Sequence, residues 1–335
     1  MPGNIVIRGD GVAALCCIRL LGQAGLGVTV EGSARPKLPA VMLSDGTQKL
    51  LQDVFDRPDI FNGVTRIRSR IVAWGPGSKP MELPHSAVVL SEQELLERIP
   101  QPHTQDSPKS REGQAAWTIF ATRPLPQEVE ENHFGSRIAS VAAVKLKRKS
   151  RAEACWIESL EDGWLFLLPV NEAAWLLSVG GAVESLLGRS RMIADQVSEV
   201  RPAGGGFPSH PRIAQSLCAP GWLACGTAAL GFDPLCGDGA GHAAREAILA
   251  SAVVCATIDG ADVDAAVAHY RSRLIAGFHR HLVVCREFYK SGGQGPWWKE
   301  QLEALRRGLE WCQSVRATIA TSRYRLNGFS LEAAE

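Results

Sequence analysis

The sequence contains no apolar run long enough to cross a membrane and no cysteine spacing typical of a metal site. None of its hydrophobic stretches reaches the roughly 18 residues of a spanning helix, and no basic segment followed by an apolar stretch opens the chain. The nine cysteines form no C-x-x-C pair, which disfavours a zinc ribbon or a disulfide framework. We therefore expect buried free thiols, a cytoplasmic location, no membrane contact and no metal site.

The chain also lacks an excess of either charge. Its 36 lysine and arginine residues nearly balance 35 aspartate and glutamate residues, so we expect no nucleic-acid-binding surface. What the composition does provide is a hydrophobic fraction of 45% over 335 residues. That fraction is enough for a sizeable folded core and argues against global disorder.

The front of the chain carries a dinucleotide-binding pattern. A β-rich run at 4–8 and a strand at 28–31 flank a helical segment that begins with the G-x-G-x-x-A turn Gly9-Asp10-Gly11-Val12-Ala13-Ala14. The first glycine makes the tight turn, the second lets backbone approach a pyrophosphate, and the small alanine allows close helix–strand packing. Glu31, at the end of the second strand, can accept hydrogen bonds from an adenosine ribose. The pattern favours FAD or NAD over NADP, and an unliganded βαβ turn is the alternative.

The segment after Glu31 helps to choose the cofactor. Arg35 begins a loop that leads into a helix at 45–55, where a second βα unit would be expected in a simple nicotinamide dehydrogenase. FAD proteins of the glutathione-reductase kind interrupt the Rossmann unit in this way and complete the flavin site with a late segment. We therefore favour FAD.

A candidate for that late segment is 221–242. It begins with a short apolar strand at 222–225, continues as a glycine-rich loop and enters a helix at about 240–258. Loop glycines let backbone approach a ligand, and the free N–H groups of a first helical turn favour an anion. An ordinary strand-to-helix turn is the alternative. For Asp233 in this loop, a carboxylate that caps the turn is a further alternative.

The remaining pattern predicts an α/β fold with a second, strand-rich unit. We expect strands at 64–74, 81–83, 87–90, 117–122, 138–147, 152–159, 163–169 and 174–180, helices at 92–99, 182–197, 263–286 and 296–316, and an exposed loop at 100–114. The predicted units are a Rossmann-like FAD-binding domain of glutathione-reductase type (1–70, 115–130 and 200–260), an antiparallel-sheet substrate domain (71–114 and 131–199) and a C-terminal helical region (261–335). No role is assigned to the last fifteen residues.

Taken together, several segments resemble p-hydroxybenzoate-hydroxylase-type FAD proteins, and within them the tryptophan-halogenase-like monooxygenase branch. They are the front turn with Glu31, the strand Ile119-Phe120-Ala121-Thr122-Arg123, and the loop from Gly226-Thr227 through Asp233-Pro234-Leu235-Cys236-Gly237-Asp238-Gly239. The strand Gly163-Trp164-Leu165-Phe166-Leu167-Leu168-Pro169 and the residues Pro296-Trp297-Trp298 are similar to further segments of that branch. The resemblance covers almost the whole chain.

Three departures separate this chain from the pattern it resembles. Thr227 stands where the family has an aspartate, although its hydroxyl can still donate to phosphate or ribityl oxygens. The middle strand has Ala121-Thr122-Arg123 where the family shows Ala-Thr-Gly-Arg. The region between residues 100 and 117 is also shorter than in the family. Besides these three departures, the second tryptophan of the halogenase Trp-x-Trp-x-Ile-Pro motif is absent, which disfavours halogenation.

The resemblance implies an FAD-dependent monooxygenase that hydroxylates an aromatic, indole- or phenol-like group through a flavin C4a-hydroperoxide. The alternatives are another flavin redox enzyme, a maturation enzyme that modifies a tryptophan in a partner polypeptide, and a degenerate flavoprotein without turnover. The implied substrate is an aromatic small molecule or peptide. Because no further G-x-G-x-x-G motif marks a nicotinamide site, a separate flavin reductase is a candidate partner.

The resemblance also assigns roles to individual positions. The implied cofactor-binding residues are Gly9, Gly11, Ala13, Ala14, Glu31, Arg35, Thr122, Thr227, Asp233, Pro234, Gly237, Asp238, Gly239 and Ala240. The catalytic candidates are His242, on the first turn of the late helix, and His85, next to a strand expected to line the substrate chamber; a packed or solvent-facing histidine is the alternative for each. The aromatic side chains of Trp164, Phe166, Trp297 and Trp298 form either a substrate box or part of the core.

Overall fold

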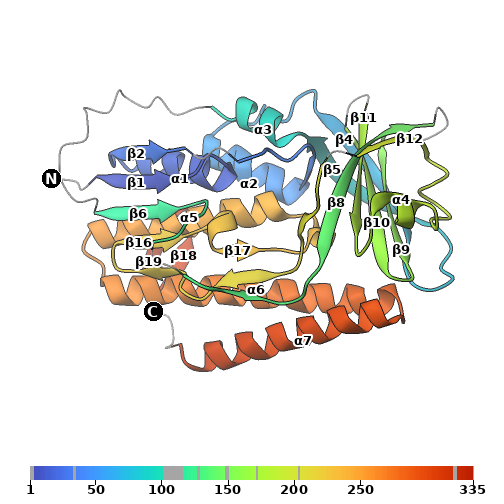
Figure 1. Ribbon diagram of the computed structural model, residues 1–335. Coiled ribbons are helices and arrows are strands. Elements are labelled where there is room, and N and C mark those ends of the chain that lie inside the picture. Colours follow the sequence, from blue (N-terminus) through green and yellow to red (C-terminus); the bar gives the residue numbers. More distant parts are fainter. Residues whose placement is uncertain are drawn as a thin grey trace.

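The computed structural model describes residues 4–32, 35–100, 116–126, 129–147, 151–170, 173–202, 204–319 and 323–334. Two sheets form the two ends of the molecule, and the C-terminal helices run along both of them (Figure 1). The helices are α1 (Val12–Gln23), α2 (Asp45–Phe55), α3 (Glu92–Arg98), α4 (Val183–Leu187), α5 (Gly239–Ile258), α6 (Val263–Gly292) and α7 (Pro296–Ala317), with the 3-10 turns η1 (Gly226–Ala228) and η2 (Pro234–Cys236). Within these ranges no helix is both long and apolar enough to cross a membrane.

The first sheet is the Rossmann-like one. Its order is β15–β16–β6–β1–β2, and all neighbours are parallel except the terminal pair β15–β16. The strands are β1 (Ile5–Arg8), β2 (Val28–Glu31), β6 (Trp117–Phe120), β15 (Cys218–Ala219) and β16 (Trp222–Ala224). Alternation along β1 buries Ile5 and Ile7 completely. Because parallel strands share one carboxyl edge, the turns that follow β1, β6 and β16 meet at the same place.

The second sheet is large and mainly antiparallel, with the order β12–β8–β11–β10–β9–β4–β5–β3 and β13 added against β8. Its strands are β3 (Val41–Ser44), β4 (Thr65–Ala73), β5 (Met81–Leu90), β8 (Ile138–Leu146), β9 (Ala154–Leu160), β10 (Gly163–Val170), β11 (Ala173–Val179), β12 (Val197–Pro202) and β13 (Phe207–Pro208). Along β10, Leu165 and Leu167 pack on the α4 side, whereas Phe166 and Leu168 belong to a separate cluster on the opposite face. The sheet therefore has two apolar faces.

The long C-terminal helices connect the two sheets (Figure 1). On α6, the hydroxyl of Tyr270 donates to the carbonyl of Ala224 in the first sheet at 2.6 Å. On α7, Nε1 of Trp298 donates to the carbonyl of Leu160 in the second sheet at 2.9 Å. Two small sheets complete the fold: β7 (Glu131–His133), β14 (Arg212–Ala214) and β17 (Leu230–Gly231), and the hairpin β18 (Tyr324–Asn327) with β19 (Ser330–Ala333).

The helix predicted at 182–197 is wrong beyond its first turn. Only α4 is helical, and the chain then wraps around the buried carboxylate of Glu158. That carboxylate accepts backbone N–H groups of Arg191, Met192 and Ile193 at 2.8–3.3 Å, and the hydroxyl of Ser190 at 2.5 Å. The Glu158 carboxylate thus accepts hydrogen bonds from amides that would bond to backbone carbonyl groups within a helix.

The predicted strands differ from the structure in two ways. The segments 81–83 and 87–90 form one strand, β5, which includes Pro84 beside a register shift of β4. Strand β3 and the terminal hairpin were not predicted. Apart from residue 100, the loop predicted at 100–114 lies outside the described residues. The division into three units remains a prediction. Strand β3 and most of β4 lie within 1–70, the first segment of the predicted FAD-binding domain, but both strands pair within the large sheet.

Candidate functional site

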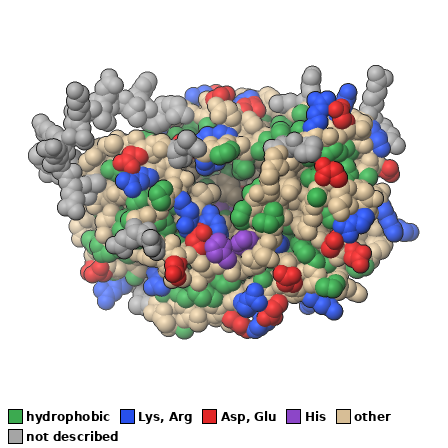
Figure 2. All heavy atoms as spheres, in the orientation of Figure 1, with side chains coloured by type: hydrophobic (Ala, Val, Ile, Leu, Met, Phe, Trp, Pro, Cys, Tyr) green, Lys and Arg blue, Asp and Glu red, His purple; other side chains and the backbone are tan. Residues whose placement is uncertain are grey.

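A cavity of about 460 Å³ opens where the carboxyl edge of the Rossmann-like sheet meets one apolar face of the large sheet. Figure 2 shows this face hollowed near its centre, with basic and histidine side chains along one side and hydrophobic side chains along the other. The start of α1 and the loop before α5 line one end of the cavity. The other end is lined by Val141, Phe166, Leu168, Trp175 and Leu177 of the large sheet.

Two glycines let three turns approach one another at the carboxyl edge. Gly9 has φ +134°, and a Cβ there would lie 3.2 Å from Cβ of Ala121, after β6. Gly226 has φ +56°, and a Cβ there would lie 3.0 Å from Cβ of Ala13. Other residues would be strained at either φ and crowded by the facing turn. Ala13, Ala121 and Gly226 line the cavity, whereas the assigned residues Gly9 and Ala14 do not.

Two helix N-termini face the cavity with amides that their own caps leave free. The N-cap residue of α1 is Gly11, which has no side chain to accept a hydrogen bond, and the side chain of Asp238, the N-cap of α5, accepts none from the first turn. By contrast, the N-caps of α2 and α3, Ser44 and Ser91, do accept one. A Cβ added to Gly239 would meet no atom within 4 Å, so ligand can approach this backbone. Free amides with partial positive charge fit a diphosphate and the electron-rich edge of a flavin.

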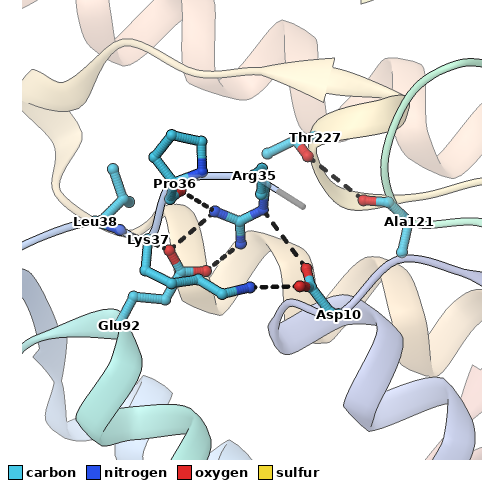
Figure 3. Close-up of polar contacts among 8 residues, drawn as sticks. All are labelled: Asp10, Arg35, Pro36, Lys37, Leu38, Glu92, Ala121 and Thr227. Atoms are coloured by element: carbon cyan, nitrogen blue, oxygen red, sulfur yellow. Dashed lines mark hydrogen bonds and ion pairs between the residues drawn. The ribbon is translucent and has the colours of Figure 1, made fainter. Parts of the chain in front are cut away.

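Arg35 lies over the start of α1 (Figure 3). Its guanidinium forms a close ion pair with Glu92, its Nε is 4.0 Å from Oδ1 of Asp10, and Nζ of Lys37 is 2.6 Å from the other Asp10 oxygen. Burial alone would raise the pKa of Glu92, but hydrogen bonds from Arg35 and the Leu38 amide outweigh it and lower that pKa. The network fixes a guanidinium beside the α1 turn.

The structure places the other front-motif residue, Glu31, on the surface of the protein. It ends β2, and its Oε2 accepts from Nε of Arg8 at 2.6 Å in an exposed ion pair. Glu31 does not line the cavity. Its role toward a ribose therefore stays a prediction.

The two threonines assigned to the cofactor do line the cavity. Thr122 follows β6, and its amide donates to the carbonyl of Arg8 at 3.2 Å. The Thr227 hydroxyl donates to the carbonyl of Ala121 at 3.4 Å (Figure 3). Nη2 of Arg212 donates to the Thr227 carbonyl at 2.8 Å, and Arg212 also pairs closely with Glu131.

The side chain of Asp233, which was assigned to the cofactor, is bonded to protein groups instead. Oδ1 accepts the Leu235 amide at 2.9 Å, which is the capping alternative. Oδ2 accepts the Tyr289 hydroxyl at 2.8 Å and lies 3.0 Å from Nη2 of Arg137. The carboxylate is thus fully buried and engaged, whereas the backbone around Asp233 and Pro234 lines the cavity.

Asp238 also has structural partners. Thr47, in the first turn of α2, donates from Oγ1 to Oδ1 of Asp238 at 2.5 Å, and Nη1 of Arg245 donates to Oδ2 at 2.9 Å. The bond from Thr47 connects the starts of α2 and α5, and the bond from Arg245 lies within the α5 segment. Gly237, Gly239 and Ala240 line the cavity on either side of Asp238.

The two catalytic candidates are not brought together. His242 lines the cavity and stacks on Phe232 with 4.0 Å between ring centroids. Burial lowers the pKa of His242 to about 4, so its imidazole is neutral near pH 7. His85 lies on β5, and no residue of β5 lines the cavity, so the strand expected to line the chamber near His85 does not do so. Its Nε2 is 3.1 Å from Nη2 of Arg70, and burial and that arginine lower its pKa.

The structure settles the alternatives for the aromatic group. Trp164, Trp297 and Trp298 belong to the main core or pack against it, and Nε1 of Trp164 donates to the Tyr289 hydroxyl at 3.1 Å. Phe166 faces the cavity, together with Trp175 from the next strand. Among the described residues no cluster of histidine, cysteine, aspartate or glutamate could hold a metal ion.

Several cavity-lining residues were missed from the sequence: Trp175, His210, Arg212, Glu246 and His281. Of these, Glu246 left a signal, because it is an acidic residue one helical turn after His242 within an alanine-rich helix. His281 enters from α6, and its Nε2 accepts the Asp233 amide at 2.9 Å. No local pattern marks the others, since tertiary packing alone brings them to the site.

The chain has the fold of flavin-dependent halogenases and hydroxylases, as the sequence predicted. No family model and no curated protein matches it, whereas solved structures do. The flavin-dependent halogenase CmlS is 18% identical with a TM-score of 0.75, over 95% of this chain and 71% of that chain. The peptidyl tryptophan dihydroxylase QhpG is 19% identical with a TM-score of 0.69, over 90% and 79%. Klebsiella pneumoniae HpxO, complexed with FAD and uric acid, is 15% identical with a TM-score of 0.63, over 94% and 93%. These likenesses establish the fold.

Proposed function

We propose that the protein is an FAD-dependent monooxygenase that hydroxylates an aromatic, indole- or phenol-like group. One observation carries the proposal: a single cavity joins two uncapped helix N-termini to an apolar, aromatic-bearing wall. A dinucleotide at the first end would therefore share one enclosed space with an aromatic group at the second.

The residues at the helix N-termini fit the cofactor. The amides of the α1 turn, with Gly9 and Gly11, and the guanidinium of Arg35 would hold the diphosphate. Backbone at Gly237, Gly239 and Ala240 would lie against the ring system, where the α5 terminus favours negative charge. When bound, the flavin supplies the oxygen-transfer chemistry.

The apolar wall would orient the substrate and exclude water. Phe166 and Trp175 offer ring faces and edges to an aromatic group, and Leu168 and Leu177 keep the chamber dry. His242, neutral near pH 7, could accept a hydrogen bond from a substrate N–H or O–H at its unprotonated ring nitrogen. This role rests on its position in the cavity.

The functions of the structural neighbours support hydroxylation of aromatic groups. HpxO was solved with uric acid, and QhpG acts on a peptidyl tryptophan. The absent second tryptophan of the halogenase motif makes halogenation the less favoured activity. The substrate is then a small aromatic molecule or an aromatic side chain of a peptide, and a separate reductase would supply the electrons.

The first experiment is the visible absorption spectrum after FAD loading and removal of free FAD. Persistent bands near roughly 370 and 450 nm would support the flavin site. The loaded protein is then reduced and exposed to isotopically labelled dioxygen with indoles, phenols and tryptophan-containing peptides. Labelled oxygen in a product is the expected result. A colourless protein would overturn the proposal, and a bound flavin that transfers no oxygen would favour another redox task.

A further inference from the structure

Glu246 brings a buried carboxyl group to the place where the late loop meets the α1 turn. It lies on α5, its exposed fraction is 7%, and it lines the cavity. Its Oε2 accepts the Gly226 amide at 2.7 Å. Since Gly226 itself packs against Ala13, the carboxyl group is held beside the turn that fits a dinucleotide.

The second oxygen of Glu246 is available to a ligand. Among the described residues, Oε1 has no hydrogen-bond partner, and Glu246 forms no ion pair. Oε1 is not one of the fully buried polar atoms that lack a partner, so it reaches the open space of the cavity. A polar ligand in the cavity is the partner that the position offers.

The groups around Glu246 favour its neutral form. Arg245, on the same helix, is engaged with Asp238. The Cys225 thiol, directly after β16, and the Tyr270 hydroxyl of α6 face Glu246. A hydrogen bond with Cys17 of α1 and burial raise the pKa of Cys225, and burial raises the pKa of Tyr270, so both groups are uncharged. Burial raises the pKa of Glu246 to about 8. The hydrogen bond from the Gly226 amide and the charge of Arg245 lower this pKa by smaller amounts.

We propose that Glu246, as a neutral carboxylic acid, donates a hydrogen bond from Oε1 to the ribityl–diphosphate chain of the flavin while Oε2 accepts the Gly226 amide. The inference rests on the proposed flavin site. An ionised carboxylate could only accept hydrogen bonds and would repel the diphosphate. The late loop thus gains a donor at the position where Thr227 turns its hydroxyl to Ala121.

The proposal predicts that FAD affinity depends on pH through this one group. If only the protonated form binds, the dissociation constant rises about tenfold between about pH 7 and about pH 9 for a group with a pKa near 8. Glu246→Gln retains a donor and an acceptor without ionising, so its affinity should stay within about threefold of the wild type near pH 7 and show no rise with pH. Glu246→Ala should bind FAD at least about tenfold more weakly near pH 7.

The measurement is quenching of FAD fluorescence on titration with apoprotein at several pH values. Ser251→Ala, a buried polar substitution on the same helix, is the matched control and should keep the wild-type pH profile. Circular dichroism checks that each variant is folded. A pH-independent wild type, or a Gln variant with an unchanged pH dependence, would overturn the role of Glu246 and leave the flavin site standing. Absence of FAD binding by the wild type at every pH would overturn both.

Discussion

Arg137 and Asp233 form an ion pair between two completely buried side chains, with 3.0 Å between Nη2 and Oδ2. Nη1 of Arg137 also donates to Oε1 of Gln301 on α7 at 2.9 Å, and the guanidinium lies over the ring of Tyr289 on α6. Asp233 immediately precedes η2, the turn that borders the cavity. The pair therefore fixes the late loop to both C-terminal helices.

Breaking this pair on one side should strongly destabilise the protein. Asp233→Asn leaves the Arg137 charge buried without its counter-charge, and we expect the free energy of unfolding to fall by about 3–5 kcal/mol. Urea denaturation measures the change. The double variant Arg137→Met with Asp233→Asn removes both charges and should lose less than the sum of the two single variants. A single variant within about 0.5 kcal/mol of the wild type would contradict the prediction.

Gly226→Ala should impair cofactor binding more than a surface substitution does. The new Cβ would be strained at φ +56° and would meet Cβ of Ala13 at 3.0 Å, so the late loop must move away from the α1 turn. We expect about 1–3 kcal/mol lower stability and weaker FAD binding. Gly328→Ala in the terminal hairpin, at φ +57° with no atom nearby, is a matched control for strain alone. Equal losses of FAD affinity in both variants would refute the crowding argument.

His242 should make the protein sensitive to acid. Its pKa in the folded chain is about 4, against 6.5 for an ordinary histidine, because burial disfavours the charged form. Between these values the unfolded chain binds the extra proton, so stability is present above about pH 6.5 and is lost as pH falls toward about pH 4, by up to about 3 kcal/mol.

Thermal or urea unfolding across that pH range tests the prediction. His242→Gln should lose much of the acid sensitivity, because glutamine does not titrate. The control variant is His133→Gln, which removes an exposed histidine that does not line the cavity. An unchanged slope in His242→Gln would show that other groups carry the acid response.

Trp175 should contribute to substrate binding with little effect on the cofactor. It lies at the apolar end of the cavity, one residue from Leu176 of the core on the opposite face. Trp175→Leu should raise KM for an aromatic substrate about tenfold, since a stacking or edge contact contributes roughly 1 kcal/mol beyond the lost area. Its FAD dissociation constant should stay within about twofold of the wild type. A change in FAD affinity without a change in KM would contradict the assignment of Trp175 to substrate binding.

Much of the fold could be predicted because it depends on local signals. The turn at Gly9 and Gly11 and the alternation along β10 each follow from a few neighbouring residues. The helix expected at 182–197 failed because Glu158, distant in the sequence, accepts the amides of that segment. Helical periodicity carries no information about such an acceptor.

The candidate site divides in the same way. Gly11, the glycines of the late loop and the start of α5 could be assigned from their motifs, and they line the cavity, whereas Gly9 does not. The carboxylate of Asp233 could not be placed, because its partners Arg137 and Tyr289 come from segments far along the chain. His281 and Trp175 reach the cavity only through the packing of α6 and the pairing of β10 with β11.

The alternation of side chains across β10 and β11 separates two properties of the protein. Leu165, Leu167 and Leu176 hold the sheet to the α4 side, while Phe166 and Trp175 line the chamber from the same strands. Substitutions at alternate positions can therefore reshape the chamber while the stabilising core keeps its composition. A library restricted to the cavity-facing positions would vary the shape of the chamber at low cost in stability.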